Sequence, residues 1–339
     1  MNARSSRSLA AIVGGLLLLI GASTSVRAQS VGASTVPWTP QRLADGQPDI
    51  QGMWNNEEAN FTPLELPKEL EGRSSFTPEE LRARAEALAK RRIEAGDSTG
   101  PGDVGFYALY WFDWYWRKPA AGDWPALLVE PRNGRMPALT PEAQKNAAYM
   151  REHLHDSYET MEAGDRCISR GVLGMMMPTA YNNGKLILQS PGYVVIHSEM
   201  VHNARIIPVD TRPHVDPKIR YWEGDPRGRW EGNTLVIEST NFKAVDNLRS
   251  ASGRAMQTEK RRMIERLTIV DANTLKYSVT VDDPATFTSP WTVSFPYTRD
   301  DTYRQFEYAC HEANYSVPNS LSGARAEERT GAAAKPPSR

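Results

Sequence analysis

A short stretch in the middle of the chain combines two histidines with a carboxylate. His197, Glu199 and His202 lie within the sequence HSEMVH. On a strand, residues 197 and 199 project to the same face, because successive side chains alternate. A carboxylate beside a histidine orients the imidazole and stabilises its cation, which makes the pair a workable general base. The same trio also matches a zinc site with water as the fourth ligand, or polar residues on a solvent-exposed face.

Other polar residues are candidates for the same site. His311 directly follows Cys310, and we expect it to face one cavity with His197 if their strands are neighbours. Asp113 lies among aromatic rings, where burial favours the protonated carboxyl of a general acid. Arg205 interrupts an apolar strand, so it either meets an internal acid or binds an anionic group of a ligand. The remaining candidate ligand contacts are His214 and Tyr193.

The stretch FYALYWFDWYWRK, residues 106–118, holds eight aromatic side chains in thirteen positions. Its rings cover nearly every face of a helix and both faces of a strand, so the rest of the protein must cover them. We expect the stretch to pack over the fold, to line a ligand site as a lid, or to do both. Membrane contact is a third alternative, although a membrane-lying helix needs a polar, basic face. The ligand contacts expected here are Tyr110, Trp111 and Trp114.

Several familiar catalytic motifs are missing from the sequence. It contains no HExxH, no CxxC and no glycine-rich phosphate loop after a strand. A nucleotide-dependent enzyme is therefore disfavoured, and we expect no organic cofactor.

Two helices are predicted before the region that carries these residues. SFTPEELRARAEALAKRRIEAG has Thr77 as N-cap, Pro78 at the first helical position and Glu80 to complete a capping box. LTPEAQKNAAYMREHLH is predicted as a second helix with Thr140 as its cap.

The sequence period changes from about residue 184, where short β-branched or aromatic runs alternate with turn residues. Eight such runs at short spacing favour an antiparallel barrel or sandwich, since closure removes exposed edges. A barrel of about eight strands can hold one small ligand. The runs are KLILQS, YVVIHSE, ARIIPV, RWEGNTLVIEST, MIERLTIVD, TLKYSVTVD, PWTVSFPY and YRQFEYA.

The first 28 residues are typical of an export signal. Arg4 and Arg7 precede the apolar run LAAIVGGLLLLIGA, and Val26-Arg27-Ala28 forms a cleavage site before Gln29. The apolar run is shorter than the roughly 20 residues that a spanning helix needs, although a retained membrane anchor is the alternative. We expect a periplasmic or secreted protein with no stable membrane insertion after the signal is removed.

The net charge limits the classes of binding partner, and the cysteine content predicts a disulfide. Removing the signal leaves 37 Lys and Arg against 41 Asp and Glu, a net charge of about −4. This balance disfavours nucleic acid and anionic membrane surfaces, both of which attract clustered basic residues. The two cysteines, Cys167 and Cys310, favour a disulfide in an oxidising compartment, with two buried free thiols as the alternative.

Several sequence blocks together resemble a large family of exported bacterial proteins. The resemblance implies export and a lipocalin-like, calycin-type β-barrel with an N-terminal extension, and it brings no reaction with it. Relatives have fewer rings in the aromatic stretch, which points to a particular ligand. The blocks are DGQPDIQGMW (45–54), LLVEPRNGRMPALTPEAQ (127–144), RCISRG (166–171), PGYVVIHSEMVHNARIIPVDTRPH (191–214), GDPRGRWEGNTLVIESTNF (224–242) and VDDPATFTSPWTVSFP (281–296).

Together these observations predict a mainly β protein. We expect a helical and irregular extension over 29–160, an antiparallel lipocalin-like β-barrel over 161–315 and a disordered tail over 316–339. The favoured function is an exported enzyme that acts on a small hydrophobic, aromatic or polycyclic molecule by cofactor-independent acid–base chemistry, as a lyase, isomerase or hydrolase. A non-catalytic lipocalin-like binding protein for the same ligands and a zinc-dependent hydrolase are the alternatives.

Overall fold

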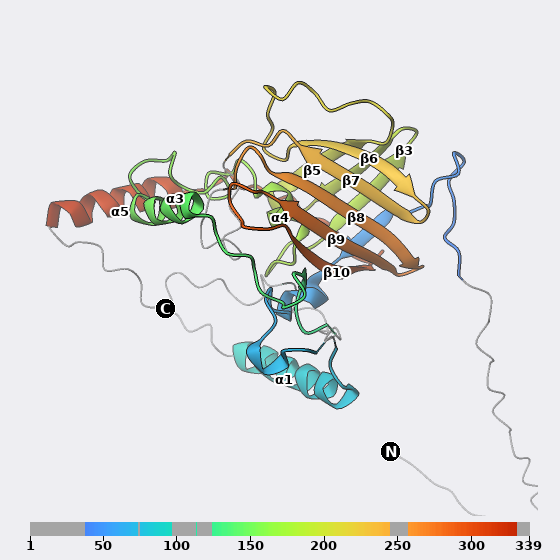
Figure 1. Cartoon of the computed structure of the whole chain (residues 1–339). Helices are drawn as coiled ribbons and strands as arrows, with labels where there is room; N and C mark the ends of the chain where they lie inside the picture. Colours follow the sequence, from blue (N-terminus) through green and yellow to red (C-terminus); the bar gives the residue numbers. More distant parts are fainter. Residues whose placement is uncertain (1–37, 74, 97–112, 114–123, 245–256, 331–339) are drawn as a thin grey trace, which may run out of the picture. The chain divides into compact units, whose positions relative to one another are not determined.

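The structure is a computed structural model of the whole chain, shown in Figure 1. It describes residues 38–73, 75–96, 113, 124–244 and 257–330. The predicted export signal and all of the aromatic stretch except Asp113 lie outside the described residues.

Antiparallel strands dominate the described residues, as the sequence predicts. They form one sheet in the order β5-β4-β3-β1-β10-β9-β8-β7-β6, with β2 paired to β10, and this sheet curls into a nearly closed barrel of nine strands. The strands are β1 (Gly52–Asn55), β2 (Leu128–Glu130), β3 (Lys185–Ser190), β4 (Tyr193–Ser198), β5 (Asn203–Pro208), β6 (Asp225–Glu231), β7 (Thr234–Thr240), β8 (Arg262–Asp271), β9 (Thr274–Asp282) and β10 (Trp291–Arg299).

The barrel encloses a core formed by every second residue of its strands. On β9, Leu275, Tyr277, Val279 and Val281 are fully buried, while the side chains between them are at least partly exposed. The same alternation runs along β8 and β10, so the period-2 pattern of the sequence reports the two faces of the sheet correctly.

The barrel nearly closes between its two outermost strands, β5 and β6. Gly228 of β6 lies so close to β5 that an added Cβ would come within 3.0 Å of the Ile207 side chain. A larger residue at this position would therefore require the side chains of Ile207 and Val209 to shift.

Two strands of the sheet come from the segment that the sequence assigned to the N-terminal extension. β1 lies between β3 and β10, with Trp54 opposite Lys185 on one side and Arg299 on the other. β2 adds to β10, where Leu128 is opposite Val293. The boundary predicted at residue 161 therefore does not separate barrel from extension, because the barrel is incomplete without residues 52–55.

Four α-helices accompany the barrel in the described residues. The predicted capping box is present, because the Thr77 amide donates to Glu80 Oε2 at 2.7 Å and the Glu80 amide to Thr77 Oγ1 at 3.2 Å. Thr140 Oγ1 likewise accepts from the Ala143 amide. The helices are α1 (Pro78–Gly96), α3 (Pro141–Glu152), α4 (Gly171–Met176) and α5 (Ser316–Thr330), and the 3-10 helices are η1 (Glu57–Phe61), η2 (Lys68–Leu70) and η4 (Met200–His202).

Helix α5 occupies most of the tail for which the sequence predicted disorder, so that prediction is wrong for Ser316–Thr330. The run ARAEER within it consists of good helix formers. Arg325 also donates to the backbone oxygens of His155 and Asp156, which connects α5 to the segment after α3. Such a long-range contact leaves no mark in the local sequence.

Residues 300–315, which we call the C-terminal strap, form no strand. The prediction of a strand at YRQFEYA is therefore wrong. The backbone amide of Phe306 donates to the Glu199 side chain instead of a neighbouring strand. No helix in the described part of the chain is long and apolar enough to cross a membrane.

Candidate functional site

A pocket of about 530 Å³ forms where the C-terminal strap meets the β4–β5 connection and the segment before β6. This volume lies in the usual range for small-molecule sites. The pocket is lined by Cys167, Ile168, Val201, His202, Asn203, Trp222, Glu223, Glu307, Tyr308, Ala309, Cys310, His311 and Glu312.

The backbone around this pocket adopts unusual conformations. Cys167, Val201 and His202 all have positive φ angles, of 56°, 61° and 53°. Such angles are uncommon outside glycine, and for a β-branched residue such as Val201 they are a true outlier. Backbone strain of this kind clusters at functional sites, where the surrounding structure enforces it. Here it turns the chain after β4 so that His202 reaches the pocket.

Glu223 is the best-positioned carboxylate of the pocket. Its Oε1 accepts hydrogen bonds from the Ser169 hydroxyl at 2.5 Å and from the Asn203 amide nitrogen at 2.7 Å. Its Oε2 has no hydrogen-bond partner among the described residues. One oxygen is thus fixed by two donors, and the other is available to a bound molecule.

Gly224 sets the position of Glu223 at the start of β6. Its φ is +72°, and an added Cβ would come within 2.6 Å of the Thr240 backbone oxygen and 2.7 Å of the Phe242 ring. Only glycine combines this angle with this close approach.

Two histidines predicted from the sequence, His202 and His311, line this same pocket. The His202 ring packs edge-on against the ring of His197, with centroids 4.7 Å apart. His197 Nδ1 is 2.7 Å from Gln305 Oε1 of the strap. Because a glutamine carbonyl oxygen only accepts, Nδ1 carries the proton when His197 is neutral. His197 thus supports His202 from behind and is not among the lining residues.

Glu199 does not orient His197, contrary to the prediction. Its Oε1 accepts from the Phe306 amide at 3.0 Å and its Oε2 from the Tyr303 hydroxyl, and the side chain is buried. The residue adopts helical angles after the end of β4, so the strand alternation that places 197 and 199 on one face does not extend to it. Glu199 anchors the strap. Burial, together with Asp113 and Glu199, raises the pKa of Tyr303.

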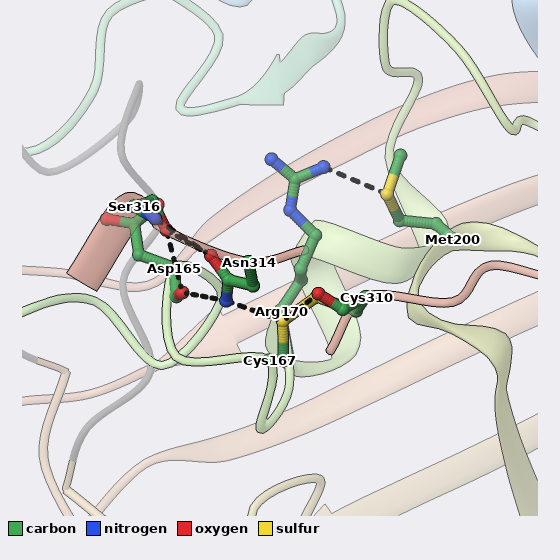
Figure 2. Close-up of a disulfide and its surroundings, with 7 residues drawn as sticks. All are labelled: Asp165, Cys167, Arg170, Met200, Cys310, Asn314 and Ser316. Carbon is green, nitrogen blue, oxygen red and sulfur yellow. Dashed lines mark hydrogen bonds between the residues drawn. A yellow bond between two sulfur atoms is a disulfide. The ribbon is translucent and has the colours of Figure 1, made fainter. Parts of the chain in front are cut away.

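A disulfide joins Cys167 to Cys310 at the edge of the pocket and confirms the predicted pairing, with the Cα atoms 5.6 Å apart. A second contact near the disulfide, shown in Figure 2, also connects the two segments: the side-chain amide nitrogen of Asn314 donates to the Asp165 backbone oxygen at 3.1 Å. Disulfides persist in oxidising compartments, so this bond fits export, which stays a prediction.

Asp113 does not lie at this pocket. Its carboxylate accepts hydrogen bonds from the backbone amides of Asn182 and Asn183 and from the Asn183 side chain, at 2.8–3.1 Å. These contacts fix the turn before β3. The predicted role as general acid has no support in this arrangement, because both oxygens serve as acceptors.

Lys185 is buried at the start of β3, and its ammonium donates to the Asn183 backbone oxygen at 3.2 Å. Burial lowers the pKa of Lys185 from its usual 10.5 to about 8, and the charges of Glu199 and Asp113 oppose this shift. The folded protein therefore holds the Lys185 proton less tightly than the unfolded chain.

This difference predicts how stability depends on pH. Between about pH 8 and pH 10.5 the unfolded chain binds a proton at Lys185 that the folded protein has lost. The contribution of Lys185 to the free energy of unfolding must then rise with pH in this window, by up to about 3 kcal/mol. Urea unfolding of the wild type and of Lys185→Met across this range measures it. The exposed Lys276→Met is the control, and equal slopes for all three proteins would contradict the prediction.

Arg205 meets an internal acid, one of the two roles that the sequence allowed. Its guanidinium forms two parallel hydrogen bonds with Glu265, at 2.9 and 2.6 Å, and both side chains are buried inside the barrel. The Tyr277 hydroxyl also donates to Glu265. The pair occupies the barrel interior, where the sequence placed a ligand.

The remaining predicted contacts lie elsewhere. Tyr193, at the opposite end of β4, accepts a hydrogen bond from Arg212 at 3.1 Å. His214 Nδ1 is 3.0 Å from the buried Asp225, which fixes the loop before β6. Neither residue lines the pocket. Tyr110, Trp111 and Trp114 lie outside the described residues.

Glu223 and its supports Ser169 and Asn203 escaped the sequence reasoning. The available signal was an acid next to Trp222 and directly before a glycine, in the run YWEGDP. Nothing in that run indicates that two distant donors fix its carboxylate.

The described residues contain no group of three or more His, Cys, Asp or Glu side chains placed to hold a metal ion. The trio His197, Glu199 and His202 therefore does not form the zinc site considered above. The class that the structure defines is a nearly closed antiparallel β-barrel with a disulfide-bordered pocket. Comparison with family models, curated proteins and solved structures finds no match to this chain.

Proposed function

We propose that the protein is an exported enzyme that moves protons on a small organic molecule bound in the disulfide-bordered pocket, without an organic cofactor. The observation that carries this proposal is the carboxylate of Glu223, fixed through one oxygen and unoccupied at the other, in one pocket with His202 and His311. The resemblance to exported calycin-type barrel proteins and the disulfide support export.

Glu223 acts as the general base in this proposal. A carboxylate already held by Ser169 and Asn203 needs little reorganisation to meet a substrate proton. His202 and His311 supply the acid, because histidine changes charge between pH 5 and pH 8. The rings of Trp222 and Tyr308 offer contact to an apolar part of the substrate. The reactions open to such a site are elimination, isomerisation and hydrolysis.

A model substrate tests the general base directly, without knowledge of the natural substrate. In 5-nitrobenzisoxazole a base removes the ring C–H proton, the N–O bond breaks, and a coloured cyanophenolate forms. We expect Glu223→Gln to lower kcat/KM for this reaction by about 10²-fold or more, the usual contribution of a general base. Glutamine keeps one oxygen to accept from Ser169 and Asn203, but it replaces the free oxygen with an NH2 group, which cannot act as a base.

Glu152→Gln, an exposed change on α3, is the matched control and should leave kcat/KM unchanged. His202→Gln and His311→Gln should alter the pH dependence of the rate. Wild-type kcat/KM in Glu223→Gln would overturn the assignment of the base.

A binding protein without turnover is the second candidate, because small antiparallel barrels commonly carry ligands. The buried Arg205–Glu265 pair inside the barrel weighs against a ligand there and leaves the disulfide-bordered pocket as the site. Saturable binding with no turnover over a broad substrate panel would favour this candidate. A zinc-dependent hydrolase is not proposed, since the described residues offer no suitable ligand group.

A further inference from the structure

The wall of the disulfide-bordered pocket is rich in carboxylates, and among the described residues its only basic side chains are those of His202 and His311. Three of its residues are glutamates, Glu223, Glu307 and Glu312, and none is Lys or Arg. Among the described residues none of these three carboxylates forms an ion pair. Three carboxylates outnumber two histidines, and a pocket with an excess of one sign of charge attracts ligands of the opposite sign.

Two arginines near this wall along the chain contact other groups. Arg166 lies over the ring of Tyr158, 5.4 Å from its centre. Arg170 directs one guanidinium nitrogen to the Met200 sulfur at 3.0 Å, as Figure 2 shows. Among the described residues neither arginine forms an ion pair with a carboxylate of the wall, although the charge of Arg205 interacts with that of Glu223.

Aromatic rings lie in the same wall. Trp222 and Tyr308 both line the pocket, and the exposed ammonium of Lys243 already lies 4.8 Å from the centre of the Trp222 ring. Tryptophan is the ring that attracts cations most strongly. The wall therefore combines the two kinds of group that recognise organic cations, carboxylates and aromatic faces.

We propose that the molecule bound in this pocket is a small organic cation, a protonated or quaternary amine attached to a ring or a short apolar chain. This inference rests on the proposed function for its site and names the class of its substrate. Glu307 and Glu312 attract the charged group, while the rings contact the apolar part. The volume of about 530 Å³ suits a ligand of one or two rings.

A pair of nearly isosteric probes tests the charge. Phenethylamine is a cation at neutral pH, and phenethyl alcohol has the same size without the charge. Titrations followed by NMR should show that the amine binds about tenfold more tightly, as expected for an ammonium near partly hydrated carboxylates. The preference should shrink as salt is added, because salt screens exposed charges.

Variants test whether the carboxylates of the wall cause the preference for phenethylamine. Glu307→Gln/Glu312→Gln should reduce the preference for the amine several-fold, whereas Glu142→Gln/Glu152→Gln on α3 should leave it intact. Equal affinity for both probes in the wild type, or an unchanged preference in the wall variant, would overturn the inference.

The outcomes also separate this inference from the proposed enzyme function. Amine-selective binding with no effect of Glu223→Gln on turnover keeps the inference and removes the enzyme. Turnover that depends on Glu223 without preference for the amine keeps the enzyme and removes the inference.

Discussion

Replacing Glu265 with glutamine is expected to lower the free energy of unfolding by about 3–5 kcal/mol, as measured by urea unfolding. The change removes the charge that pairs with Arg205 but leaves the guanidinium inside the barrel. The ion pair is buried, with the two side chains only 3% and 0% exposed. Without Glu265 the buried Arg205 guanidinium is still removed from water, but no opposite charge compensates for the lost hydration. The Tyr277 hydroxyl, which donates to Glu265, loses a charged acceptor as well.

Two controls separate burial from charge in this experiment. Glu231→Gln breaks the exposed pair with Arg266 on the outside of the barrel and should cost less than about 1 kcal/mol. The double replacement Arg205→Met/Glu265→Leu should recover most of the lost stability, because apolar residues of similar volume can replace a buried pair. A loss in Glu265→Gln no larger than that in Glu231→Gln would contradict the account.

The same ion pair supports placing the proposed ligand site outside the barrel interior. Arg205 and Glu265 come from β5 and β8, so their contact crosses the barrel interior. A molecule entering there would have to separate or displace a buried charged pair, which is strongly unfavourable. A ligand site between the strap and the β4–β5 connection avoids this cost.

Much of the fold could be predicted from the sequence. The alternation of β8, β9 and β10 and the caps at Thr77 and Thr140 are local signals, and all of them are confirmed. The errors share one cause. β1 and β2 have four and three residues, too few for a periodic pattern, and only their distant partners make them strands. The strap shows an alternating pattern, but it forms no strand: its Phe306 amide donates to the Glu199 side chain.

The candidate site was predicted only in part for the same reason. His202 and His311 carried a signal because histidine is rare in this chain, and both line the pocket. The role of Glu199 was assigned from strand alternation, which ends one residue earlier. Glu223 gained its place through Ser169 and Asn203, contacts between residues up to 54 positions apart. Local spacing carries no information on contacts of this kind.

Replacing both disulfide cysteines, as Cys167→Ser/Cys310→Ser, is expected to lower the free energy of unfolding by about 5 kcal/mol. The bond joins residues 143 positions apart, and the entropy of closing so long a loop in the unfolded chain gives this magnitude. It also holds the strap, which brings Glu307, Tyr308, His311 and Glu312 to the pocket.

The variant should therefore lose amine-selective binding even under conditions where circular dichroism shows a folded barrel. We expect this loss because the strap residues that line the pocket lie between the remaining anchors, which include Tyr303 and Gln305 before the disulfide and Asn314 and Arg325 after it. Reducing the wild type with a phosphine should reproduce both losses, and the same treatment should leave the serine variant unchanged. Full binding in the folded serine variant would show that the strap keeps its place without the disulfide.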